Sequence, residues 1–597
     1  METALKQVKA HRKLFENYIF PLILLLFPLI AVNEGIDISD TTYNLTNYEY
    51  FSKMDLNWKL SILIPSVFGH LVSLLPFAGS LLGFRIYASL FEGVFSNIIY
   101  FVSKKYIPGW MIFIGEIIAL SICWCPSVIF YNYMTYFFMS MGIILLLSAI
   151  NEGDTSKQRN KFMLAGAIFG LNVFVRLPNV MEVLFILILF FASYIEREDI
   201  KSVRNKFCYC VAGFVITVLV IMIIICAVYG MASYMDMIEW LSSLSADSNS
   251  SHGMASSFSS IMSAYSKTLK EMFMMLLCTI LGLIMFMLWR GNEKLYIIKK
   301  IVYILGIFVL IKYYFSTGTF TTNYYYYDSM FEVAMMFIII SIVLDILDVL
   351  SAIFERLGKG YVFIPGTSGE RLLSFTSLLI ILITPIGSDN YTFPIINNLF
   401  LVAPITLVQI RRVLRRMKKG ENIKFRQTFP IRAMVMMVLV VLLIQGTFFK
   451  FGFSFVDGAD GTVRDSTVSI DKAKYMTTTT VNATHIENIY DAILANGMEN
   501  YKLFVFGNAP GLSFIYDMEP AIYTSWPSLE SNRVSDVDEG LMNMDRDTVI
   551  IMEKKDESTK TTSFSQKEDI ILDYIAESDY NIIFEDDLYK VFGPEKN

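Results

Sequence analysis

Long apolar runs, separated by short polar or basic segments, fill the first three quarters of the chain. An apolar run of about 20 residues is long enough to cross the hydrocarbon core of a bilayer as a helix. Another apolar segment, 60–79, is interrupted by Pro65, Gly69 and Pro76, so we expect helices that lie at the membrane interface there. The pattern predicts about thirteen transmembrane helices, in segments 15–32, 83–102, 110–125, 128–150, 162–178, 180–195, 207–229, 272–289, 301–315, 330–350, 372–386, 395–410 and 433–449.

The pattern changes after residue 450, where the apolar runs shorten to strand length and charged residues become frequent. Short apolar runs between turn residues predict strands, and a 3.6-residue period predicts helices. We therefore expect a small C-terminal α/β domain at 451–597, following a polytopic helical region at 1–450. Its predicted strands are 502–507, 548–553, 581–586 and 588–592, and its predicted helices are 486–495 and 566–577.

Composition supports a membrane protein and excludes a nucleic-acid partner. The 597 residues are 54% hydrophobic and only 17% charged, with a mean hydropathy of +0.51. A net charge of -6 and a pI near 5.5 do not provide the basic face that nucleic-acid binding requires. We expect a multi-pass protein of the plasma membrane that contacts membrane lipids.

Basic residues predict the orientation of the spans, because loops rich in Lys and Arg stay on the cytoplasmic side. Lys6, Lys9, Arg12 and Lys13 place the N-terminus in the cytoplasm. An odd number of spans then places the C-terminal domain outside the cytoplasm. On the same outer side, the small and polar residues of 232–267 predict a mobile loop or lid, or a plain linker.

An acidic first outer loop, 33–59, follows the first span. It carries Glu34, Asp37, Asp40 and Glu49. Ionisable residues at a membrane exit indicate a functional site, because such charges are costly near hydrocarbon unless they face water or a ligand. The alternatives are a solvated acidic loop and, for Asp40, the N-cap of a helix that begins at DTTY.

Two arginines near the outer ends of predicted spans are candidates for binding an anion. Arg85 begins the second span, and Arg176 lies at the end of a later one, two residues before Pro178. A guanidinium group matches phosphate oxygens through two parallel hydrogen bonds. The alternative for Arg176 is a side chain that extends its charge to the membrane surface.

The order of these parts resembles the GT-C class of membrane glycosyltransferases, which includes protein O-mannosyltransferases, lipid A aminoarabinose transferases and many bacterial relatives. The architectural resemblance covers the whole chain. The first loop lacks the adjacent Asp-Glu pair that many members carry, which leaves the choice between Asp37 and Asp40 open. Local resemblance is found in GIDISDTTY (35–43), GFRIYASLFEGVFSNIIYFVSKK (83–105), GLNVFVRLPNV (170–180) and FGNAPGLSFIYDMEPAIYTSWP (506–527).

This resemblance implies an enzyme of the bacterial cell envelope that transfers a sugar from a polyprenyl-phosphate donor to a glycan, lipid or protein acceptor. Asp40 is then the expected base, with Asp37 as the second candidate. Arg176 and Arg85 are expected to bind the donor phosphate. The resemblance implies no particular cofactor, and a divalent cation held by Asp37 is an open alternative.

A polytopic transporter or lipid flippase is the alternative function. Such a protein is expected to show repeated halves and ionisable residues deep in the bundle. In this sequence no repeat is evident, and the candidate charges lie near the predicted outer ends of the spans.

Overall fold

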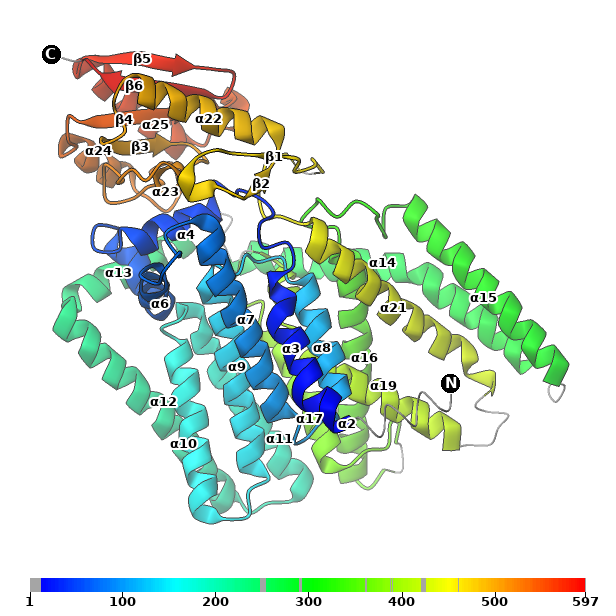
Figure 1. Ribbon diagram of the computed structural model, residues 1–597. Coiled ribbons are helices and arrows are strands. Elements are labelled where there is room, and N and C mark those ends of the chain that lie inside the picture. The colour runs from blue at the N-terminus through cyan, green and yellow to red at the C-terminus, as the bar shows by residue number, and fades with distance from the viewer. Residues whose placement is uncertain are drawn as a thin grey trace.

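The protein is a bundle of helices with a small α/β domain at one end (Figure 1). The computed structural model describes residues 12–246, 254–288, 293–359, 362–386, 388, 390–419, 426–459 and 461–595. We call the end of the bundle that carries the C-terminal domain the domain face, and the other end the opposite face.

The helices of the bundle lie where the apolar runs predict them. Seven described helices are long and apolar enough to cross a membrane, so the chain is a multi-pass membrane protein as predicted. They are α7 (Leu81–Ser103), α9 (Phe130–Ile150), η3 with α11 (Leu177–Glu196), α12 (Ile200–Val228), α14 (Met254–Met287), α16 (Phe331–Arg356) and α21 (Phe429–Gly452).

Each remaining predicted span is also helical, at least in part, but it is shorter, broken or more polar. The segment 60–79 forms α6, which is too short for a span and follows another short helix. The two short helices near segment 60–79 are α5 (Leu56–Ser61) and α6 (Leu63–Ser73). The helices of the remaining predicted spans are η1 (Phe15–Ile19), α3 (Phe20–Leu26), η2 (Phe27–Leu29), α8 (Gly109–Ile122), α10 (Thr155–Asn172), α15 (Glu293–Ser316), α17 (Ser368–Ile383), α18 (Phe393–Asn397) and α19 (Val402–Lys419).

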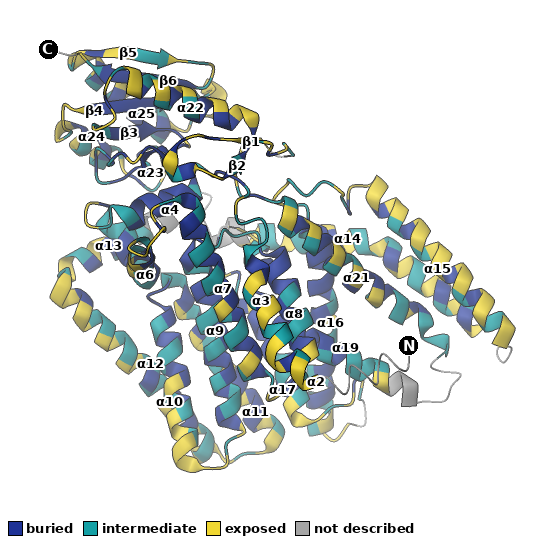
Figure 2. Cartoon of the chain, in the orientation of Figure 1, coloured by how far each residue is buried: buried dark blue, intermediate teal, exposed yellow. Residues whose placement is uncertain are grey.

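Burial divides the bundle into a packed centre and an apolar periphery. Helices α8, α9 and α16 are largely buried, whereas few residues of α12 and α14 are buried and many are exposed (Figure 2). Ile223 and Ile224 on α12 and Phe273 and Leu276 on α14 are among these exposed residues. Apolar side chains on a helix of spanning length face lipid, so α12 and α14 lie at the lipid-facing surface.

Helices α10 and α12 pack with their backbones in direct contact. A Cβ atom at Gly213 on α12 would lie 1.9 Å from the Met163 carbonyl oxygen of α10, and one at Gly166 would lie 1.8 Å from the Cys210 carbonyl oxygen. Small residues allow membrane helices to approach in this way. The pair is therefore held by backbone contact at two points of the same interface.

The first test concerns this contact. Gly213→Ala is expected to lower the free energy of unfolding by about 1–3 kcal/mol, because the new methyl group must push α10 and α12 apart. Gly306→Ala on α15 is the matched control, since no heavy atom lies within 4 Å of its Cβ position. Thermal unfolding of the purified proteins measures both, and equal melting temperatures for the two variants would contradict the contact.

The predicted loop at 232–267 is wrong in the described part of the chain. Helix α13 (Met231–Ala246) and the start of α14 occupy it. Tyr234 and Met237 pack in a small apolar core with Leu60 and Val173, and the Trp240 Nε1 donates to the Ser531 carbonyl oxygen at 2.9 Å. These long-range contacts stabilise a helix that the local polar composition does not favour.

The C-terminal domain contains a four-stranded sheet in the order β3-β4-β6-β5. Strands β3 and β4 are parallel, and the β4–β6 and β5–β6 pairs are antiparallel. All four strands and both helices predicted for this domain are present, so the small α/β domain is confirmed. Its elements are β1 (Ser466–Thr467), β2 (Thr477–Thr478), α22 (Thr480–Ala495), β3 (Lys502–Phe506), α23 (Leu512–Ile515), α24 (Val534–Met542), β4 (Thr548–Glu553), α25 (Thr562–Glu577), β5 (Tyr580–Glu585) and β6 (Tyr589–Pro594).

Candidate functional site

The acidic loop lies between the bundle and the C-terminal domain, and helix α4 (Asp40–Glu49) forms its centre. Gly35 N donates to the Thr477 carbonyl oxygen at 2.8 Å, and Gly511 N donates to the Ile38 carbonyl oxygen at 2.9 Å. A Cβ atom at Gly511 would lie 1.5 Å from Thr42 Oγ1, so only glycine permits this approach. The loop is therefore fixed by backbone contacts with the domain.

The two candidate aspartates have different surroundings. Asp37 is fully buried, and its carboxylate accepts hydrogen bonds from Ser39 N (2.9 Å), Ser39 Oγ (2.6 Å) and Thr41 N (2.7 Å). These bonds satisfy donors at the start of α4, which is the work of a helix cap. Asp37 therefore performs the capping role that was the alternative for Asp40, and no side-chain hydrogen bond engages the Asp40 carboxyl among the described residues.

Burial raises the pKa of both aspartates. Burial and the neighbouring charge of Asp37 raise the pKa of Asp40 to about 7. Burial raises the pKa of Asp37 too, and the hydrogen bonds from Ser39 and Thr41 oppose that rise. A carboxyl with a pKa near neutrality can both accept and release a proton at physiological pH, as a general base requires.

Arg85 lines a polar cavity of about 90 Å³ at the domain face. Its Nη1 donates to the Glu34 carbonyl oxygen at 2.7 Å, and Asp37 lies within its electrostatic range. Lys450, near the end of α21, lines the same cavity and has no hydrogen bond or ion pair among the described residues. Two cations thus border one cavity beside the first loop.

Arg176 lies at the domain face but borders a different cavity, of about 20 Å³. Its guanidinium carbon is 5.9 Å from the centre of the Tyr131 ring. Asp40 and Arg176 both interact electrostatically with Tyr131, which places all three in one neighbourhood. The structure therefore brings Arg85 near Asp37 and Arg176 near Asp40.

A buried ion pair joins the last span, the first loop and the C-terminal domain. Arg464 Nε lies 3.2 Å from Asp457 Oδ2, and both side chains are inaccessible to solvent. Asp457 Oδ1 accepts from Thr478 Oγ1 (2.6 Å) and from Asn482 Nδ2 (2.9 Å), and this amide also donates to the Ile36 carbonyl oxygen. The connection after α21 is thus tied to the residues next to Asp37.

Sequence reasoning did not select Lys450, Asp457 or Arg464. Lys450 could have been found from its position, because it follows the predicted outer end of a span, whereas basic residues are expected mainly on the cytoplasmic side. The Asp457–Arg464 pair has no comparable signal, since its importance comes from burial that only the folded chain shows.

The first loop offers no obvious set of metal ligands. Both carboxylate oxygens of Asp37 already accept hydrogen bonds, so the cation predicted there stays a prediction. In the part of the chain that the structure describes, the ligand atoms of His485, Asp586 and Asp587 lie within 4.8 Å of one another. His485 Nδ1 is already 2.7 Å from Asp586 Oδ2, and Asp586 also accepts from backbone groups of the turn before β6.

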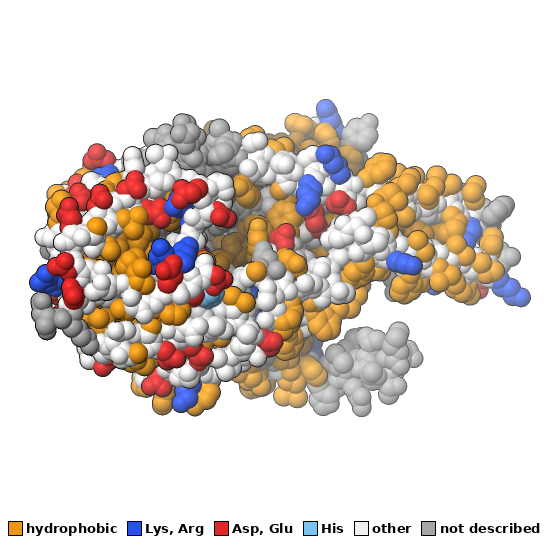
Figure 3. All heavy atoms as spheres, turned by 90° about the horizontal axis from the view of Figure 1, so that it is seen from above, with side chains coloured by type: hydrophobic (Ala, Val, Ile, Leu, Met, Phe, Trp, Pro, Cys, Tyr) orange, Lys and Arg blue, Asp and Glu red, His pale blue; other side chains and the backbone are white. Residues whose placement is uncertain are grey.

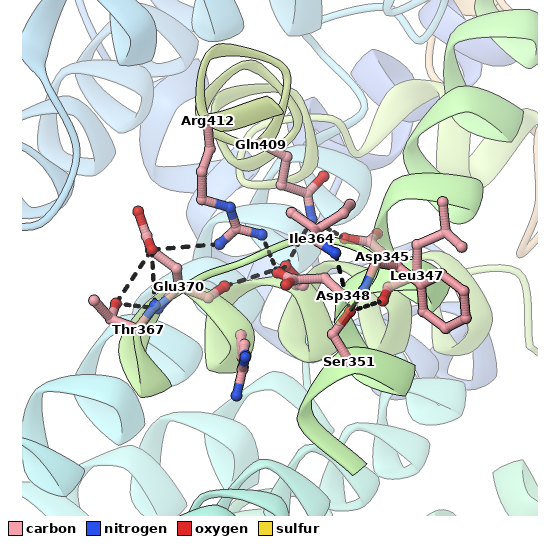
Figure 4. A network of polar contacts seen from close by, with 12 residues as sticks. Asp345, Leu347, Asp348, Ser351, Ile364, Thr367, Glu370, Gln409 and Arg412 are labelled. Carbon is pink, nitrogen blue, oxygen red and sulfur yellow. Dashed lines mark hydrogen bonds and ion pairs between the residues drawn. The ribbon is translucent and has the colours of Figure 1, made fainter. Parts of the chain in front are cut away.

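A second group of buried charges lies toward the opposite face, on α16, α17 and α19 (Figure 4). Asp348 pairs with Arg412 and accepts from Ser374 Oγ, and Gln409 Nε2 donates to Asp345 Oδ1 at 2.5 Å. Asp345 and Asp348 are fully buried. Buried ionisable residues of this kind are a feature that a transporter is also expected to show.

Comparison with known proteins finds structural likenesses among solved structures. Over 96% of its length the chain is similar to ArnT from Cupriavidus metallidurans bound to undecaprenyl phosphate, with 10% sequence identity, 96% of that chain covered and a TM-score of 0.44. No protein-family model matches the chain, and no curated protein matches it.

Proposed function

We propose that the protein is a membrane glycosyltransferase that transfers a sugar from a polyprenyl-phosphate donor at the domain face, which lies outside the cytoplasm. One observation carries the proposal. A cavity bordered by Arg85 and Lys450 lies beside a loop in which Asp37 is held by hydrogen bonds and Asp40 is not, and Asp40 has a pKa of about 7. Phosphate binding and proton removal are the two tasks that such a transfer requires.

Each candidate residue has a separate role in the proposed reaction. The acceptor hydroxyl oxygen forms a bond to the anomeric carbon of the sugar while the bond from that carbon to the phosphate oxygen breaks. Asp40 takes the proton of the hydroxyl, and Arg85 with Lys450 stabilises the charge on the departing phosphate. Arg176 provides positive charge on the Asp40 side of the loop, and Asp37 holds α4 in place.

Lys450 provides a direct test of the phosphate site. Lys450→Ala is expected to raise the KM for a synthetic polyprenyl-phosphate sugar by roughly 10- to 100-fold, because a hydrogen bond to a charged group contributes about 1.5–3 kcal/mol. Lys312→Ala is the matched control, since Lys312 is an exposed lysine near the end of α15 that borders none of the cavities described here. Steady-state transfer assays measure both variants, and an unchanged KM for Lys450→Ala would remove this lysine from the donor site.

Transport of a lipid or solute is the second candidate function, because Asp345, Asp348 and Arg412 form a buried charged cluster within the bundle. Purified protein in vesicles distinguishes the two functions. Sugar transfer from the donor without movement of lipid or solute supports the enzyme. Movement across the vesicle membrane that needs Asp348, together with no transfer from any donor tested, would replace it with transport.

A further inference from the structure

A larger cavity, of about 510 Å³, separates the first loop from the C-terminal domain. Its size is within the range of small-molecule sites. We propose that this cavity binds the acceptor as an uncharged saccharide and presents one hydroxyl group to Asp40, which lines it. This inference rests on the proposed function for the role of Asp40, and it adds the chemical class of the acceptor. The other residues that carry it are Trp526, Tyr589, His485 and Asn508.

Two aromatic side chains of the domain, Trp526 and Tyr589, line the cavity. Trp526 packs edge to face on Tyr43, with 5.4 Å between ring centres, so α4 holds the indole in position. Its Nε1 is buried and has no hydrogen-bond partner among the described residues. An indole presents a broad apolar face and one donor, and a sugar ring presents an apolar face edged with hydroxyl groups.

Polar groups that both donate and accept hydrogen bonds also line the cavity, beside apolar residues such as Val481 and Leu588. Asp586 orients the His485 ring through Nδ1 at 2.7 Å, and the nearest carboxylate to Nε2 is that of Asp587, 4.0 Å away. The side chain of Asn508 makes no hydrogen bond among the described residues. An imidazole and an amide suit hydroxyl groups, which also donate and accept.

The electrostatics favour a ligand without negative charge. No Lys or Arg is among the described lining residues, which include the carboxyl of Asp40. Segment 451–597 contains 27 acidic and 12 basic residues, and Figure 3 shows acidic side chains spread over the outer surface of the domain. A phosphate-bearing polymer would meet repulsion here, whereas an uncharged saccharide would not.

Binding can be measured on the full-length protein without any donor. Titration of the protein in nanodiscs with maltotriose, cellotriose and triacetylchitotriose, followed by calorimetry, tests the ligand class. At least one trisaccharide is expected to bind, and Trp526→Ala is expected to weaken that binding by tenfold or more. Trp526→Phe is expected to restore much of the affinity. Tyr475→Ala, an exposed tyrosine of the same domain, is expected to leave it unchanged.

The outcomes separate this inference from the proposed function. Sugar transfer by a protein that binds none of the trisaccharides would overturn the saccharide site and leave the enzyme in place. Tighter binding of a Ser/Thr-rich peptide or of a glycerol-phosphate oligomer than of every trisaccharide would also overturn it. Trisaccharide binding that depends on Trp526, in a protein that transfers nothing from any donor, would support the site and overturn the proposed function.

Discussion

Replacement of Asp40 with Asn is expected to lower the rate of sugar transfer by roughly 10²- to 10⁴-fold while the protein stays folded, because loss of a general base typically has an effect of this size. The substitution keeps the shape of the side chain and removes its ability to accept a proton. No side-chain hydrogen bond of Asp40 is lost among the described residues, and the cap of α4 is provided by Asp37. Transfer assays and melting curves of the same preparations measure the two effects separately.

The pH dependence provides a second readout of the same group. Because the pKa of Asp40 is raised to about 7, the carboxyl becomes protonated as the pH falls through neutrality and can no longer act as a base. The kcat/KM of the wild type is therefore expected to fall on the acid side with a midpoint near pH 7.

Asp37→Asn is the matched control for Asp40→Asn. It weakens the hydrogen bonds to Ser39 and Thr41, so its main expected effect is a lower melting temperature. A stable Asp37→Asn variant with no transfer, beside a fully active Asp40→Asn variant, would reverse the assignment of the two aspartates.

The parts of the fold that sequence predicted best are those set by local pattern. Apolar runs of spanning length fix the helices of the bundle, because a backbone in lipid must satisfy its own hydrogen bonds. Alternating apolar residues likewise predict β3 and β4. The prediction of a loop at 232–267 failed because Tyr234 and Met237 stabilise α13 through contacts with residues far away in the sequence, such as Leu60 and Val173.

The candidate site could be predicted only in outline. Charge and position along the spans identified Asp37, Asp40, Arg85 and Arg176, and the structure places all four at the domain face. The two aspartates differ because the turn before α4 directs the Asp37 carboxylate toward the backbone N–H groups of Ser39 and Thr41, which donate hydrogen bonds to it. A local pattern suggested the opposite, because an aspartate before two threonines is a good helix start.

Tertiary contacts decided the remainder of the site. Lys450 lies beside Arg85 because α21 ends near the start of α7, a neighbourhood that no local pattern contains. Trp526 and Asp40 line one cavity because Gly511 lets the domain approach α4. Such pairs are separated by hundreds of residues, and only the packing of the chain brings them together.

Arg464→Ala is expected to cause the largest loss of stability, about 3–5 kcal/mol, because it leaves the Asp457 carboxylate buried without its counter-charge. The substitution also removes donors from the Gly452 and Ser454 carbonyl oxygens at 3.2 Å, so the connection between α21 and the C-terminal domain loosens. Ser454 lies against Gly35, where a Cβ atom would be 1.4 Å from its Oγ. A displacement of Ser454 would therefore also displace Gly35 in the first loop.

Lys502→Ala is the matched control, because its ion pair with Asp545 in the same domain is 37% and 60% exposed. Exposed pairs contribute about 0–1 kcal/mol, so little change is expected from it. Thermal unfolding compares the two variants, and hydrogen exchange of the Gly35 and Thr477 amides reports whether the loop stays docked. If Arg464→Ala melts with the wild type and those amides stay protected, the pair does not hold the domain on the loop. We expect the melting temperature and the protection of those amides to fall together in Arg464→Ala. The geometry around Asp40 then depends on a residue of the C-terminal domain. The rate of sugar transfer is expected to fall as the loop separates from the domain, even though Arg464 lines none of the cavities described here.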